Sequence, residues 1–149
     1  MQNEAVAGFS GIPWIASHPI AYPALEVVHI VGIALLLGSL VVLELRVWGL
    51  GQELPVRPLA RLALTITATG FALVLCSGLL MFASQPAELL SNRAFVLKLG
   101  FVSLAGLNAV WFHARDGLRR CDALARTQTA LSTGLWLAAI ICGRWIAYL

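Results

Sequence analysis

The fold of this chain is decided by residues 22–49, YPALEVVHIVGIALLLGSLVVLELRVWG. Between Glu26 and Glu44 lie seventeen residues that carry no formal charge when His29 is neutral. As a helix that rises about 1.5 Å per residue, this stretch is long enough to cross a hydrocarbon layer of about 30 Å. It is therefore predicted to be a membrane span.

The composition of the whole chain agrees with that prediction. Of 149 residues, 60% are hydrophobic and only 11% are charged, which is typical of multi-span membrane proteins. The predicted spans are about 24–47, 62–83, 95–113 and 127–148, with Ser91 or Asn92 as the expected N-cap of the third. Because the loops are short, the sequence predicts an all-α integral membrane four-helix bundle, a single transmembrane domain over residues 1–149. Aromatic residues and prolines in residues 9–23 predict a short interfacial segment before the first span.

The basic residues predict the orientation of the bundle. Arginines gather in the first and third connections, whereas the second connection has only Arg93. The positive-inside rule then places both termini on the periplasmic side of a bacterial inner membrane, with the lipid bilayer as the main surrounding partner. The net positive charge does not indicate nucleic-acid binding, because the basic residues are concentrated in particular loops. The start of the chain carries Glu4 and no Lys or Arg, so we expect no removable signal peptide.

The first span carries three ionisable side chains on one predicted face. Glu26 and His29 are three residues apart, and Glu44 follows Glu26 by eighteen residues, about five helical turns. An ionisable group that faces lipid is costly, so this face is expected to point at protein or at a cofactor.

Helical geometry also predicts the depth of the polar groups. His29 and the third-span residue Lys98 lie about 10 Å outward of the span centres, and Arg144 of the fourth span lies about 7 Å outward. Glu26 lies further out. These side chains form a predicted outer cluster. In it His29 is a candidate axial haem ligand, and Lys98 and Arg144 are candidate partners of the haem propionates.

Two alternatives were open for the outer cluster. Glu26 could accept a proton or pair with Arg144, and Glu26, Lys98 and Arg144 could form a purely structural ion-pair network near the interface.

His113, at the end of the third span, belongs to another level. It lies about 12 Å inward, so its predicted separation from His29 is about 20 Å along the membrane normal. Two imidazoles that share one iron must approach to about 4 Å, which argues against a single bis-histidine haem. His113 is therefore a candidate ligand of a possible second haem or metal, or a plain interfacial histidine. Glu44 with Arg46 is expected to be an interfacial anchor.

The remaining candidate residues have simpler interpretations. His18 is expected to be an interfacial histidine, with a lid over the His29 site as the alternative. Met81 is expected to be an apolar filler rather than a thioether ligand. The three cysteines are far apart in sequence and lack a C-x-x-C spacing, so we assign them no chemistry.

Several motifs together resemble a family of small four-helix bacterial inner-membrane proteins. The motifs are Tyr22-Pro23, Glu26, His29, Gly32, Glu44-Leu45-Arg46, Ser77-Gly78, Asn92 to Lys98, Asn108 to His113, and Gly143-Arg144 with Tyr148. A histidine in the first span with a lysine early in a later span is also similar to HemJ-type protoporphyrinogen oxidases and CopD-type copper proteins. The HemJ resemblance implies that His29 and Lys98 take part in haem binding. HemJ-type proteins have further histidines near the position of Glu44-Leu45-Arg46, where this chain has none.

The residues and the resemblance lead to one main functional hypothesis. The protein is expected to bind haem b in the outer half of the bundle and to transfer electrons to a periplasmic or membrane redox partner. The alternatives are a HemJ-like porphyrinogen or quinone oxidoreductase, and a non-redox structural or copper-related membrane subunit. A homodimer is a further expectation, because Gly- and Ala-rich faces are available for packing.

Overall fold

The regular structure of the described residues is entirely helical. The structure, a computed structural model, describes residues 12–120 and 122–148. Its elements are α2 (Pro13–Ser17), α3 (Ala21–Val47), α4 (Val56–Ser84), α5 (Pro86–Ser91), α6 (Arg93–Ala114), α7 (Gly117–Arg120), α8 (Ala123–Trp145) and the 3-10 turn η1 (Ile146–Tyr148). Four of them, α3, α4, α6 and α8 with η1, are long and apolar enough to cross a membrane. The predicted all-α four-helix architecture is confirmed.

The observed spans match the predicted ones and extend them by a few residues, most of all at the start of α4. Local capping explains two of the starts. The Asn92 side chain accepts hydrogen bonds from the backbone N–H groups of Ala94 and Phe95, so the prediction that Ser91 or Asn92 caps this span is confirmed for Asn92. The Asp122 side chain caps α8 in the same way, accepting from the N–H of Ala125.

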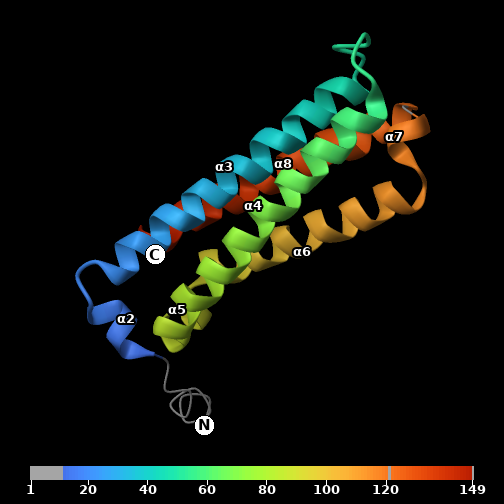
Figure 1. Cartoon of the computed structure of the whole chain (residues 1–149). Helices are drawn as coiled ribbons and strands as arrows, with labels where there is room; N and C mark the ends of the chain where they lie inside the picture. Colours follow the sequence, from blue (N-terminus) through green and yellow to red (C-terminus); the bar gives the residue numbers. More distant parts are fainter. Residues whose placement is uncertain (1–11, 121, 149) are drawn as a thin grey trace.

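The four long helices are arranged as two antiparallel hairpins (Figure 1). Helix α3 packs along α4, and α6 packs along α8; the hairpins meet mainly through α3 and α8. Direct contact between α4 and α6 is sparse. It includes the stacked rings of Phe82 and Phe95, whose centroids are 5.7 Å apart. Helices α2 and α5 lie at one end of the bundle, and α7 and the α3–α4 loop lie at the other.

Glycine allows the closest approach within the α3–α4 hairpin. A Cβ atom added to Gly70 would lie 2.6 Å from the backbone nitrogen of Leu36 and 2.7 Å from the carbonyl oxygen of Gly32. A hydrogen bond of 2.7 Å between the hydroxyls of Ser39 and Thr67 joins the same two helices. Small residues and hydroxyl pairs of this kind are the usual means of helix association in membranes.

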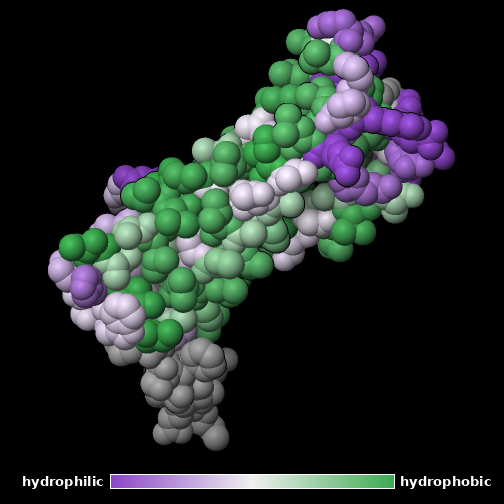
Figure 2. All heavy atoms as spheres, viewed as in Figure 1, coloured by the Kyte–Doolittle hydropathy of each residue, from purple (hydrophilic) through white to green (hydrophobic). Residues whose placement is uncertain are grey.

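The outside of the bundle is apolar along its length. Leucine, valine and isoleucine side chains on all four long helices are exposed, and Figure 2 shows hydrophobic atoms covering the body while hydrophilic atoms gather at the ends. The larger hydrophilic group lies at the end that carries the α3–α4 loop and α7. This distribution fits a bilayer around the body of the protein and identifies a multi-pass membrane protein.

Candidate functional site: a histidine and a buried polar cavity

The His29 imidazole is held between α3 and α4 by Ser77. Its Nδ1 lies 2.9 Å from the Ser77 hydroxyl oxygen. The Ser77 hydroxyl donates its own proton to the carbonyl oxygen of Leu73, one turn earlier in α4, at 2.6 Å. Because a hydroxyl has one proton to give, a Ser77 proton on the Leu73 carbonyl assigns the hydrogen of the imidazole to Nδ1, which then donates to Ser77. The hydrogen-bond arrangement therefore selects the tautomer of His29.

The other ring nitrogen is left with a free lone pair. In the tautomer selected by Ser77, Nε2 of His29 is an acceptor. It is buried and has no hydrogen-bond partner among the described residues. A buried acceptor without a partner is uncommon, and at a histidine it is the atom that a metal or a proton donor would take.

The surroundings of His29 are made of small residues and one cation. A Cβ atom on Gly78 would lie 3.2 Å from Cε1 of His29, so the ring occupies space that glycine leaves free. Lys98 of α6 is close enough to interact electrostatically with His29. Its ammonium group would lie 3.5 Å from a Cβ on Gly143 of α8. Three of the four spans and a glycine of the fourth thus meet at the level where His29 and Lys98 were predicted to lie.

Arg144 and Glu26, the other candidates for the outer cluster, lie outside this arrangement. The Arg144 guanidinium donates to the Tyr148 hydroxyl at 2.6 Å and lies over the same ring, 5.0 Å from its centroid. Both Arg144 and Glu26 are exposed. The suggested Glu26–Arg144 pair is absent from the ion pairs of the described residues.

Glu44 differs from its prediction most clearly. It was expected to anchor the end of α3 at the interface, but it is only 9% exposed. Its Oε2 accepts a hydrogen bond from the Thr133 hydroxyl of α8, and its Oε1 is buried without a partner. Glu26 and Glu44 have the same angular position on α3, and the prediction that they share an inward face is wrong for Glu26. Near the α7 end, Glu44 accepts a hydrogen bond from Thr133 of α8 and Trp48, which follows α3, donates one to Thr129 of α8, whereas Glu26 is exposed.

Glu44 lines a small cavity in this half of the bundle. The cavity has a volume of about 50 Å³. Its polar wall comes from α3, α6 and α8 and consists of Glu44, Asn108, His113, Gln128, Thr129 and Ser132. Gln128 is 3% exposed, and neither atom of its side-chain amide has a partner among the described residues. His113 is exposed and also lines the cavity, so it connects the wall to the surface.

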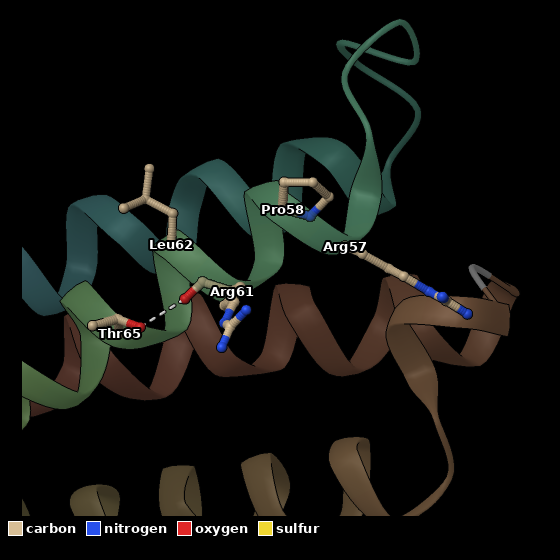
Figure 3. A pocket seen from close by; sticks show the side chains of 5 residues that line it. All are labelled: Arg57, Pro58, Arg61, Leu62 and Thr65. Carbon is tan, nitrogen blue, oxygen red and sulfur yellow. Dashed lines mark hydrogen bonds between the residues drawn. The ribbon is translucent and has the colours of Figure 1, made fainter.

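A shallow basic groove lies on the outer face of α4. It is lined by Arg57, Pro58, Arg61, Leu62 and Thr65 and has a volume of about 550 Å³. In Figure 3 the Arg57 and Arg61 side chains extend from successive turns at the start of α4. Its two cations lie at the hydrophilic end of the bundle, where lipid headgroups would meet the protein.

The structure gives no ligand-binding role to His18 or to the described cysteines. Nδ1 of His18 accepts hydrogen bonds from the backbone N–H groups of Ile20 and Ala21 at the start of α3, at 3.3 and 3.2 Å. Cys76 and Cys142 are free thiols, whereas Cys121 lies outside the described residues. No group of three or more His, Cys, Asp and Glu side chains suited to a metal ion occurs within residues 12–120 and 122–148.

Sequence reasoning missed two functional features. Ser77 was identified only as part of the Ser77-Gly78 motif, and not as the hydrogen-bond partner of His29. Gln128 was not singled out, because it falls at the start of the predicted fourth span and resembles an interfacial residue. The signal available in the sequence was that Gln128, a polar residue, lies near the start of the fourth span, at the end of the bundle where Glu44 lies near the end of the first.

Comparison of the chain with protein-family models, with curated proteins and with solved structures finds no match.

Proposed function

We propose that this chain is a b-type haem protein of the bacterial inner membrane that transfers electrons, with His29 as an axial ligand of the iron. The observation that carries the proposal is the buried Nε2 of His29, which has no hydrogen-bond partner among the described residues. When bound, haem supplies an iron centre that accepts and releases one electron.

The residues around His29 suit that role. A ligand histidine commonly donates its second ring N–H to a neighbouring acceptor, which orients the ring and strengthens the ligand nitrogen. Ser77 provides such an acceptor 2.9 Å from Nδ1. Lys98 supplies a cation on the opposite hairpin for a propionate carboxylate. Arg144, engaged with Tyr148, is a secondary candidate for the other propionate.

The arrangement of the hairpins supports access from the membrane. Because α4 and α6 make few direct contacts, the α4–α6 side of the bundle is the side on which a flat apolar ligand would disturb the least packing. Nε2 of His29 is buried without a partner among the described residues, whereas His113 is exposed, so we propose one haem rather than two.

The proposed orientation places the α3–α4 loop and α7 in the cytoplasm and both termini in the periplasm. The arginines at positions 57, 61, 119, 120 and 126 all belong to the loop and α7 end, in agreement with the positive-inside rule. His29 would then lie in the periplasmic half, within reach of a periplasmic or membrane redox partner.

Absorption spectroscopy tests the proposal. Protein purified in detergent from cells supplied with haem is expected to show a Soret band, and dithionite reduction is expected to give sharp α and β bands. His29→Ala should abolish these bands, whereas His18→Ala and His113→Ala should retain them. Size-exclusion profiles and circular dichroism check that each variant is folded. A wild-type protein without a Soret band, or a His29→Ala protein with an unchanged one, would refute the assignment.

A further inference from the structure

Glu44 and Gln128 both line the cavity, and together they carry three buried side-chain atoms that have no hydrogen-bond partner among the described residues. They are Oε1 of Glu44 and both Nε2 and Oε1 of Gln128. Both side chains are at least nine-tenths buried, with exposures of 9% and 3%. Leaving such atoms unpaired in an apolar interior is costly, so a small polar ligand is expected among them.

The identity of these atoms indicates the ligand. A cation could bind the two oxygens but would face the hydrogens of the Gln128 amide, whereas water can accept from Nε2 and donate to both oxygens. A site needs only about 10–15 Å³ to hold a water molecule, and this cavity has about 50 Å³. The cavity therefore suits a short chain of water molecules.

The surroundings of Glu44 favour its neutral form, because an ionised carboxylate is costly to bury without a cation. Glu44 makes no ion pair within the part of the chain that the structure describes. The residues that α4, α7 and α8 place in the cavity wall, namely Leu64, Leu118, Gln128, Thr129 and Ser132, are uncharged. The titratable group contributed by α6 is His113. Only the neutral acid is compatible with this interior at low cost.

We propose that this cavity is a hydrated proton-exchange site, in which the Glu44 carboxyl stores a proton and His113 passes it to the surface. In the outward step, the O–H bond of the Glu44 carboxyl breaks, the proton crosses the cavity water, and an N–H bond forms on the neutral imidazole of His113; the reverse step returns a proton from solvent to the transient Glu44 carboxylate. The exposed imidazolium then releases the proton to solvent at the loop and α7 end of the bundle. This proton-exchange site does not depend on haem binding, because His29 is not among the residues that line the cavity.

Infrared spectroscopy tests the proposal directly. Protein reconstituted in phospholipid vesicles is expected to show the carbonyl-stretch band of a protonated carboxylic acid. Glu44→Gln should remove this band and keep the acceptor for Thr133, and the matched control Glu26→Gln should leave it in place. After a rapid switch from H₂O to D₂O the wild-type band should shift, and His113→Ala should slow that shift.

Further measurements keep the proposal falsifiable if Glu44→Gln does not fold. In Gln128→Leu, which replaces the amide with an apolar group, the Glu44 band should move to higher frequency because the carboxyl loses hydrogen-bonded water. A wild-type protein without such a band at any pH, a band that does not exchange with D₂O, or equal exchange rates in wild type and His113→Ala would overturn the proposal. Loss of the band when sodium replaces choline at constant pH would overturn it in favour of a cation site.

Discussion

His29 shows how one hydroxyl can define the chemistry of a buried ring. The Ser77 proton is committed to the Leu73 carbonyl, so the hydroxyl oxygen can serve the imidazole only as an acceptor. Nδ1 then carries the hydrogen, and Nε2 presents its lone pair to the interior. Gly78 leaves room for the ring in this position.

Replacing Ser77 tests this control of the His29 tautomer. Ser77→Ala removes the acceptor for Nδ1 and is expected to weaken haem binding about 10–100-fold, the usual cost of losing a partner that orients a ligand histidine. Titration of the purified apoprotein with haem, followed by absorbance, measures the change. Thr69→Ala is the matched control, because Thr69 is an exposed hydroxyl of the same helix that bonds only to the Thr65 carbonyl. Equal affinities for Ser77→Ala and wild type would contradict the role of Ser77.

At the scale of helices, the α3–α4 hairpin depends on backbone proximity. At Gly32 and Gly70 the two helices approach so closely that an added Cβ would meet backbone atoms of the other helix, which cannot move aside as a flexible side chain can. This contact sets the rotation of α3 about its axis. Through that rotation it also sets which side chains of α3 face α8 and which face outward.

Enlarging Gly70 is therefore expected to separate α3 from α4. Gly70→Ala should lower the free energy of unfolding by about 1–3 kcal/mol, the usual cost of an added methyl group in a packed interior. Gly100→Ala on α6 is the control, since no heavy atom outside the helix lies within 4 Å of its Cβ position. Thermal unfolding in detergent, followed by circular dichroism, compares the two. A Gly70→Ala protein as stable as Gly100→Ala would show that the backbone contact is unimportant.

The start of α8 has a pH-sensitive cap. The hydrogen bond from the Ala125 N–H lowers the pKa of Asp122 below its ordinary value, and Arg115, whose guanidinium lies 2.9 Å from the carboxylate, lowers it further. Since the folded pKa is below the unfolded one, the stability contributed by the carboxylate is fully present above the unfolded pKa. It is lost as the pH falls through the folded pKa.

Asp122→Asn tests this dependence, because asparagine keeps a cap acceptor and loses the charge. Between neutral pH and about pH 3, the wild-type melting temperature should fall more steeply than that of Asp122→Asn. Asp122→Ala, which loses both the cap and the charge, should be the least stable of the three at neutral pH. Parallel pH profiles for wild type and Asp122→Asn would show that the ionised carboxylate adds nothing to stability.

At the scale of the whole molecule, polarity and charge divide the bundle into two ends. The apolar body leaves its exposed leucine, valine and isoleucine side chains to lipid, and the larger group of hydrophilic residues lies at the α7 end (Figure 2). Arginines dominate that end, including Arg57 and Arg61 of the basic groove (Figure 3). This asymmetry supports the proposed orientation, with the His29 level and the Glu44 cavity in opposite halves of the membrane.

Reporter fusions test the orientation. Alkaline phosphatase, which is active only outside the cytoplasm, should be active when it is fused to the C-terminus and inactive when it is fused after Gln52 in the α3–α4 loop. Replacing the arginines of the α7 end with glutamine should reduce this preference, because the positive-inside rule depends on those charges. The reverse pattern of activity would place His29 in the cytoplasmic half and contradict the proposed topology.

The sequence by itself determined the four spans, the Asn92 cap and the common level of His29 and Lys98. These features follow from hydropathy, capping chemistry and the rise of a helix, which are local properties. Only the tertiary structure decided that Ser77 selects the His29 tautomer, that Arg144 turns to Tyr148, and that Glu44 is buried while Glu26 is exposed. Glu26 and Glu44 have the same position on the helical wheel. Their surroundings differ because Glu44 hydrogen-bonds to Thr133 of α8 whereas Glu26 is exposed, and a periodic pattern contains no information about which part of a helix its neighbours cover.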